Sequence, residues 1–290
     1  MSPAGCGSGD APRAELSYKE MVANARREKS PELRTRKLAD IAFRQAEAGD
    51  EFGAEATFDL ARQASGQIED ADTQIRTAVY LAEKLAQSGR KMEAARALEP
   101  AVAAVNNLEG AEVRAGALAV IARGQATAGR QSAAAKTVAQ AESLLDKIDD
   151  LYGQTLVKGE IAKAMKEMDQ PEEVKRITGA ALELARGATD DRTRANCIAL
   201  VASQLHELGD REAGRTALNE AVAAARAIED PYSKTHAMCD VATKLGEAGY
   251  RAAAHKLLDE ADLVADTIPD RDLKMQMVEK VRTLMFTIPK

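Results

Sequence analysis

Residues 231–261 read PYSKTHAMCDVATKLGEAGYRAAAHKLLDEA, and this stretch contains the pattern that decides the fold. Gly249 lies near its middle, Ala242 stands seven residues before the glycine, and Ala261 stands twelve residues after it. The same spacing recurs along the chain every 40 residues. The recurring positions are occupied by Gly49, Gly89, Gly129, Asp169, Gly209 and Gly249, by Ala42, Ala82, Ala122, Ala162, Ala202 and Ala242, and by Ala61, Ala101, Ala141, Ala181, Ala221 and Ala261. Such a period indicates an array of structural repeats.

Within each unit, the apolar residues follow the spacing of an α-helix. Ala78, Leu81, Ala82 and Leu85 stand at i, i+3, i+4 and i+7, which is typical of a helix that buries one face. A second set of equivalent positions precedes the first helix of several units and holds Asp70, Asp150, Asp190, Asp230 and Asp270. Aspartate is a favoured helix N-cap residue. We therefore predict that each unit is a pair of antiparallel helices, A and B, joined by the glycine turn and preceded by an Asp-capped loop.

The order of small and large residues resembles the tetratricopeptide repeat (TPR) family. Ile41-Ala42, Gly49, Ala54, Phe58 and Ala61 match the family's pattern, and the resemblance extends over residues 31–287. It implies an all-α, right-handed solenoid of stacked helix hairpins, with a concave groove that is lined by the A helices and holds peptides or helices. The unit of 40 residues is longer than the family's unit of about 34 residues, and the family's helix B proline is missing.

This resemblance gives a prediction for the organisation of the whole chain, with about 13–14 helices. Residues 1–12 are expected to be a disordered tail, and residues 13–290 a single solenoid. The predicted parts are an orphan helix B at 13–28, six hairpins over about 31–268, and a C-terminal capping helix at 270–286. Pro100 lies inside a helix B and should kink it, because proline lacks the N–H of an internal hydrogen bond.

The N-terminal residues leave two interpretations open. Ala4-Gly5-Cys6-Gly7 resembles the end of a bacterial lipoprotein signal, in which Cys6 would be lipidated and anchor the protein to a membrane. Pro3 departs from that pattern, and the charged and apolar parts of a signal are absent. The favoured interpretation is an incidental cysteine in the tail of a cytoplasmic protein. No apolar run is long enough to cross a membrane, and the Ala-rich repeats suggest a bacterial protein.

Composition argues against several functional classes. The net charge is −6, so nucleic acid is not an expected partner. The three cysteines form no Cys-x-x-Cys motif, and we expect neither a metal nor a cofactor. His236 and Cys239 stand side by side at helical spacing, but a catalytic pair also needs an orienting carboxylate within hydrogen-bond reach, and a surface histidine beside a buried cysteine is the favoured interpretation. We predict that the protein is not an enzyme.

The function that remains is the binding of a protein or peptide partner. The family's groove positions correspond here to Arg36, Phe43, Arg76, Tyr80, Arg123, Lys163, Lys166, Asn196 and His206. The family's Lys/Asn/Arg clamp for a C-terminal carboxylate is not reproduced. Lys158, Lys163 and Lys166 could attract an acidic peptide, although an ordinary charged helix face explains them as well.

Two hypotheses follow. The first is an interaction module that holds a peptide or protein segment of unknown identity in its groove. The alternative is a self-associating scaffold, a possible homo-oligomer, for which Leu284, Met285, Phe286 and Ile288 could supply apolar contacts at the C-terminal end.

Overall fold

A computed structural model describes residues 16–289, and every regular element in this range is a helix. The A helices are Pro31–Glu47 (α2), Ala71–Gln87 (α4), Ala111–Thr127 (α7), Leu151–Glu167 (α9), Asp191–Leu208 (α11), Pro231–Glu247 (α13) and Arg271–Thr287 (α15). The B helices are Glu51–Ser65 (α3), Lys91–Ala97 (α5) with Glu99–Ala104 (α6), Gln131–Glu142 (α8), Pro171–Arg186 (α10), Arg211–Ala227 (α12) and Arg251–Ala265 (α14). Tyr18–Arg26 forms α1, and Val105–Asn107 and Leu145–Lys147 form the 3₁₀ turns η1 and η2.

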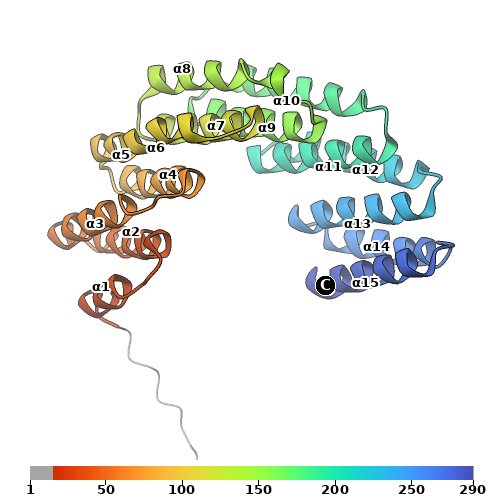
Figure 1. Cartoon of the computed structure of the whole chain (residues 1–290), viewed down its shortest axis with the longest axis horizontal. Helices are drawn as coiled ribbons and strands as arrows, with labels where there is room; N and C mark the ends of the chain where they lie inside the picture. Colours follow the sequence, from red (N-terminus) through yellow and green to blue (C-terminus); the bar gives the residue numbers. More distant parts are fainter. Residues whose placement is uncertain (1–15, 290) are drawn as a thin grey trace, which may run out of the picture.

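The hairpins stack side by side into an arch (Figure 1). Each A helix from α2 to α13 packs against the B helix of its own unit and against the A helix of the next unit. Helices α7 and α9 lie on the inner side of the arch, with α8 and α10 outside them (Figure 1). The predicted all-α solenoid of antiparallel helix hairpins is confirmed. The predicted tail 1–12 and Cys6 lie outside the described residues, and the division into domains stays a prediction.

The turn between helices A and B requires a left-handed residue in every unit. Gly49, Gly89, Gly129, Gly209 and Gly249 have φ between +76° and +96°. Glycine adopts this conformation without steric cost, which explains its recurrence. Asp169 takes the equivalent place with φ +57°, and it is the one non-glycine residue with positive φ in the described part of the chain. The fourth unit therefore has the same turn as the others.

The aspartate helix caps and the interruption of one helix B near Pro100 agree with the sequence. The side chains of Asp70, Asp190 and Asp230 accept hydrogen bonds from the backbone N–H three residues on, at 2.7–2.8 Å. Hydrogen bonds stabilise the carboxylate form and hold the pKa of each aspartate below its usual value: those from the side chain and then the backbone of Thr73 and Thr193 act on Asp70 and Asp190, and those from the backbone and then the side chain of Ser233 act on Asp230. The predicted break at Pro100 is also confirmed, because helix B of the second unit is divided into α5 and α6 at Leu98.

The recurring alanines form the core between the helices. All twelve of them are at most 1% exposed. A methyl side chain at these positions lets neighbouring helices approach closely, and a larger side chain there would overpack the interior. Because this core uses only one stripe of each A helix, the stripe facing the inside of the arch is free to vary from unit to unit.

Candidate functional site

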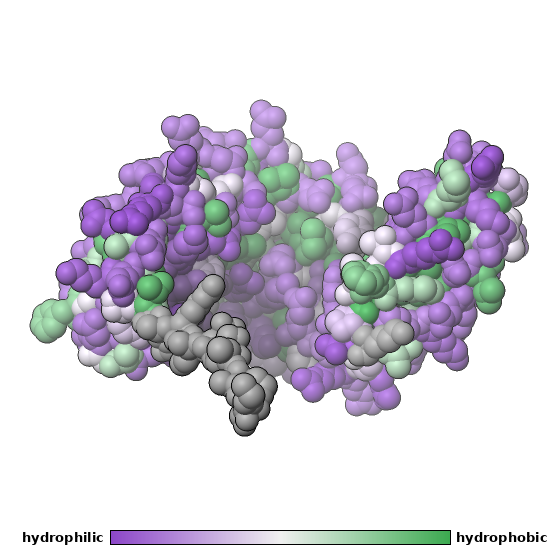
Figure 2. Space-filling view, turned by 90° about the horizontal axis from the view of Figure 1, so that it is seen from below, coloured by the Kyte–Doolittle hydropathy of each residue, from purple (hydrophilic) through white to green (hydrophobic). Residues whose placement is uncertain are grey.

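The concave face of the arch is formed by the A helices and is the candidate site. Figure 2 looks into this face and shows a hollow between two polar flanks. Side chains on neighbouring A helices pair across it at separations of 40 or 44 residues, as in Asp40–Tyr80 and Arg192–His236. The predicted groove residues all belong to A helices.

In the first units, three of the predicted residues form one cluster with Asp40 and Lys84. The guanidinium carbon of Arg36 lies 5.0 Å from the centre of the Tyr80 ring, and Lys84 Nζ lies 4.9 Å from the centre of the Phe43 ring. Tyr80 donates its hydroxyl hydrogen to Asp40, and Lys84 Nζ is 3.5 Å from the same carboxylate. Burial, followed by the hydrogen bond to Asp40, raises the pKa of Tyr80 to about 12. This cluster joins α2 to α4.

The predicted arginines in this half of the groove are paired with nearby carboxylates. Arg76 pairs with Asp72 on its own helix. Arg123 of α7 reaches back to Glu83 of α4, with 3.2 Å between nitrogen and oxygen. Neither guanidinium is an unpaired cation on the concave face.

In the predicted lysine cluster, Lys163 is paired with carboxylates in the same way. Lys163 Nζ lies 2.8 Å from Glu160 and 2.7 Å from Glu207. Burial alone would lower the pKa of Lys163, but the hydrogen bonds that its ammonium group donates to the two glutamates outweigh burial and raise the pKa. Lys166 Nζ is 3.5 Å from the backbone carbonyl oxygen of Glu207. The geometry favours the charged-face interpretation of this cluster over an acidic-peptide site.

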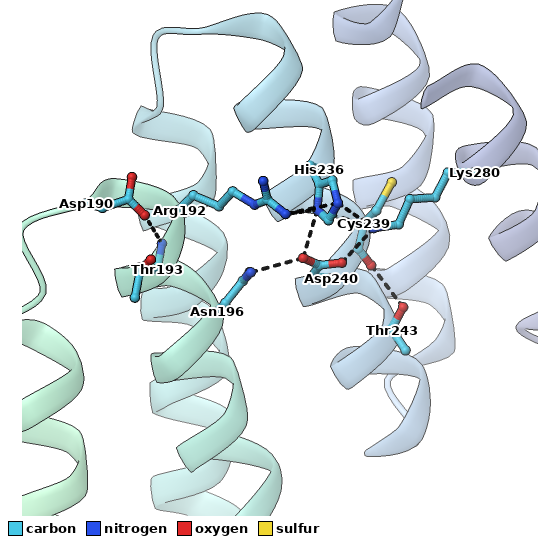
Figure 3. Close-up of polar contacts among 9 residues, drawn as sticks. All are labelled: Asp190, Arg192, Thr193, Asn196, His236, Cys239, Asp240, Thr243 and Lys280. Atoms are coloured by element: carbon cyan, nitrogen blue, oxygen red, sulfur yellow. Dashed lines mark hydrogen bonds and ion pairs between the residues drawn. The ribbon is translucent and has the colours of Figure 1, made fainter. Parts of the chain in front are cut away.

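In the last units, the concave face carries a polar network across α11, α13 and α15 (Figure 3). Asp240 is its centre: it lies 3.0 Å from Asn196 Nδ2, 3.0 Å from His236 Nδ1 and 2.8 Å from Lys280 Nζ. Arg192 Nη2 lies 3.0 Å from both ring nitrogens of His236. Burial, with the neighbouring cations Lys280 and Arg192, lowers the pKa of His236, although Asp240 opposes the shift. At neutral pH, His236 is therefore held mainly in its neutral form.

The other predicted residue in this region, His206, stands apart from the network. Its ring lies edge-on to Tyr250, with 6.1 Å between ring centres. Its Nδ1 atom is buried and has no hydrogen-bond partner among residues 16–289. The roles of all the predicted groove residues in partner binding stay predictions.

Asp240 supplies a carboxylate that could orient His236, but the neighbouring Cys239 is not suited to act as a nucleophile. Cys239 is fully buried, and burial raises the pKa of its thiol to about 11. A thiol attacks as its thiolate, so a raised pKa makes Cys239 inert at neutral pH. Among residues 16–289, no group of three or more His, Cys, Asp or Glu side chains is placed to hold a metal ion. No described helix is both long and apolar enough to span a membrane.

The middle of the concave face contains a feature that the sequence reasoning missed. Val113, Gly116 and Val120 of α7 and Leu156 of α9 form the apolar floor of a cavity of about 270 Å³, which we call the central hollow. Val113 is 48% exposed and Leu156 is 39% exposed. Figure 2 shows hydrophobic surface in the hollow of the arch.

A signal for the central hollow was present in the sequence. The equivalent inner-face position is occupied by long or polar side chains in other units, namely Arg36, Arg76, Asn196 and His236. In the third and fourth units it is occupied by Gly116 and Leu156. Polar residues are the expected sign of a groove, and this site has glycine and leucine in their place. It therefore does not stand out in the sequence.

The chain was compared with family models, curated proteins and solved structures. No family model matches the sequence, and no curated protein matches it. Among solved structures, the chain is similar to Ton1535 from Thermococcus onnurineus NA1, with 16% identity, a TM-score of 0.38, and coverage of 92% of this chain and 84% of that one. It is also similar to a structure from Podosopora anserina described as a kinesin light chain with nearly identical TPR-like repeats, with 19% identity, a TM-score of 0.35, and coverage of 70% of this chain and 100% of that one.

Similarities at this distance carry no argument about function. The architecture is evident from the stacked helix pairs, the left-handed turn in each unit and the buried alanines. The chain is a TPR-like helical repeat protein with a 40-residue unit.

Proposed function

We propose that this protein is a non-enzymatic interaction module that holds a peptide or protein segment against its concave face. A TPR-like fold suggests a role in protein interaction or as a scaffold. The central hollow is the observation that favours binding at the concave face. It offers exposed apolar side chains in a concave setting, which is where binding sites are usually found.

The hollow is also open to a close approach. A Cβ atom added at Gly116 would meet nothing within 4 Å, so space lies directly above this part of α7. A partner backbone or ring could lie against the helix there. Covering Val113 and Leu156 would remove apolar surface from water, which stabilises a complex by about 25 cal/mol per Å² before the entropic costs of association.

The alternative, a scaffold that stacks end to end, has less support. In α2, the residues Ala39 and Ala42 are buried, and the other interior A helices have small or apolar residues at the equivalent positions. In α15 these positions hold Glu279 and Arg282. Packing another helix there would bury two charges, which is costly unless both are paired. Ile288 is buried in its own chain, and Phe286, at 91% exposure, is the large apolar residue that α15 leaves most open.

The proposal is tested by selecting peptides from a random display library on the folded protein. The selected peptides are then measured against Leu156→Asp and the matched control Leu263→Asp, since Leu263 is 71% exposed on α14, outside the hollow. We expect Leu156→Asp to weaken binding at least about tenfold and Leu263→Asp to leave it unchanged. Equal affinity for both variants would contradict the proposal.

Light scattering behind a sizing column separates the two candidate functions. The interaction module predicts a monomer at all concentrations. A mass that grows with concentration and is reduced by Phe286→Asp would favour the scaffold.

A further inference from the structure

The rim of the central hollow carries more negative than positive charge. Asp72, Glu112 and Glu160 line it, and Arg76 is the one basic residue among its lining residues. Arg76 is already paired with Asp72, and Glu160 lies 2.8 Å from Lys163. Glu112 makes no ion pair within residues 16–289. One carboxylate at the edge of the apolar floor is therefore left without a cation.

The position of Glu112 is fixed by the neighbouring helix. A Cβ atom built on Gly153 of α9 would lie 2.6–2.9 Å from the carboxylate atoms of Glu112. The absence of a side chain at Gly153 is thus what lets Glu112 of α7 lie across the first turn of α9. The positive end of a helix dipole favours a carboxylate in this place. Glu112 therefore lies beside the hollow, against the first turn of α9.

We infer that the partner segment places an aliphatic or aromatic side chain in the central hollow and a lysine or arginine beside Glu112. This inference rests on the proposed function and names the chemistry of its partner. A basic residue would pair with the free carboxylate, whereas an acidic residue would face three carboxylates around a cavity of about 270 Å³. The apolar part supplies affinity, and the charged part supplies selectivity.

The test uses two labelled helical peptides of the same length, one of leucine and lysine and the other of leucine and glutamate, with affinity measured by fluorescence anisotropy. We expect the leucine–lysine peptide to bind at least about tenfold more tightly to the unaltered protein. Glu112→Gln should reduce this preference, and Glu112→Lys should abolish or reverse it. Leu156→Asp should weaken binding of the leucine–lysine peptide, because it places a charge in the apolar floor.

The net charge of −6 would attract any basic peptide weakly, so a control for long-range attraction is needed. Glu229→Lys makes the same change of charge at an exposed position in the loop before α13. It should have much less effect than Glu112→Lys. Equal losses in the two variants would overturn the inference, as would failure of the leucine–lysine peptide to bind.

The outcomes separate the inference from the proposed function. If library-selected peptides require Leu156 but are acidic or indifferent to Glu112→Lys, the inference is wrong and the proposed function stands. If no selected peptide is sensitive to Leu156→Asp, both are wrong.

Discussion

Helices α7 and α13 occupy equivalent places in the arch and carry opposite chemistry on its inner side. The inner face of α7 presents Val113, Gly116 and Val120, which leave a cavity. The inner face of α13 presents His236 and Asp240, which are occupied by bonds to α11 and α15. Ala122 of α7 and Ala242 of α13 occupy the same buried position of the repeat, so the packing at this position does not depend on the difference. In these two helices, therefore, the buried alanine position and the inner-face chemistry lie on different stripes of the same helix.

The largest expected effect is on peptide affinity, and it comes from filling the central hollow. A variant that disturbs the network around Asp240 serves as the comparison. Gly116→Phe should occupy the central hollow and weaken binding of hollow-dependent peptides by at least about tenfold, with little loss of stability, because the space above Gly116 is open. His236→Phe should lower thermal stability, because it removes the contact with Asp240, and leave peptide affinity unchanged. Anisotropy and thermal unfolding measure the two effects; the same response in both variants would remove the distinction.

A second prediction compares a carboxylate that holds the structure together with one that does not. Asp240→Ala should lower the free energy of unfolding by about 1–3 kcal/mol, because Asp240 receives hydrogen bonds from three helices and its loss leaves Arg192 beside Lys280. Glu112→Ala should change it by less than about 0.5 kcal/mol, since Glu112 is exposed and has no ion pair within residues 16–289. Denaturant titration measures both values. Equal losses would show that Glu112 also supports the fold.

Two glycines inside A helices should respond in opposite directions to the same substitution. Gly116→Ala should stabilise the protein by up to about 1 kcal/mol, because alanine is a better helix former and space is available. Gly159→Ala should destabilise it, because the new methyl group would lie 2.0 Å from the side-chain amide of Gln204, which is buried against α9. Stabilisation by both substitutions would mean that Gln204 moves aside at little cost.

The smallest expected effect is a dependence of stability on pH. The pKa of His236 is lowered in the folded protein below its usual value of 6.5, so the unfolded chain takes up the proton more readily. The stability that neutral His236 supports, between Arg192, Lys280 and Asp240, is therefore present above pH 6.5 and lost as the pH falls through the lowered pKa. Denaturant titrations of the protein and of His236→Gln between pH 7.5 and pH 5 should diverge in this window. Parallel curves would assign the acid sensitivity to other groups.

The repeat could be predicted from the sequence because it depends on local requirements. A left-handed turn selects glycine, a helix N-terminus selects aspartate, and a close helix contact selects alanine, so each leaves a residue at a fixed interval. Asp169 stands at the same interval in the sequence, and its φ of +57° confirms that it takes the place of the turn glycine.

The contacts between side chains on the inner face of the arch could not be predicted from the sequence, for a geometric reason. Whether Arg36 meets Tyr80, or Lys163 meets Glu207, depends on the offset between neighbouring A helices, which the superhelix sets and the sequence does not reveal. Most of the predicted groove residues are partnered through such contacts. The central hollow depends on small or apolar residues at Gly116 and Leu156, and on Gly153 making room for Glu112, none of which resembles a binding motif.

The central claim is that partners bind in the hollow between α4, α7 and α9. Hydrogen exchange of the full chain, with and without a library-selected peptide, tests it most directly. We expect slower exchange in α7 and the first half of α9, and unchanged exchange in α13 and α15. Protection confined to the B helices, or to α13 and α15, would contradict it.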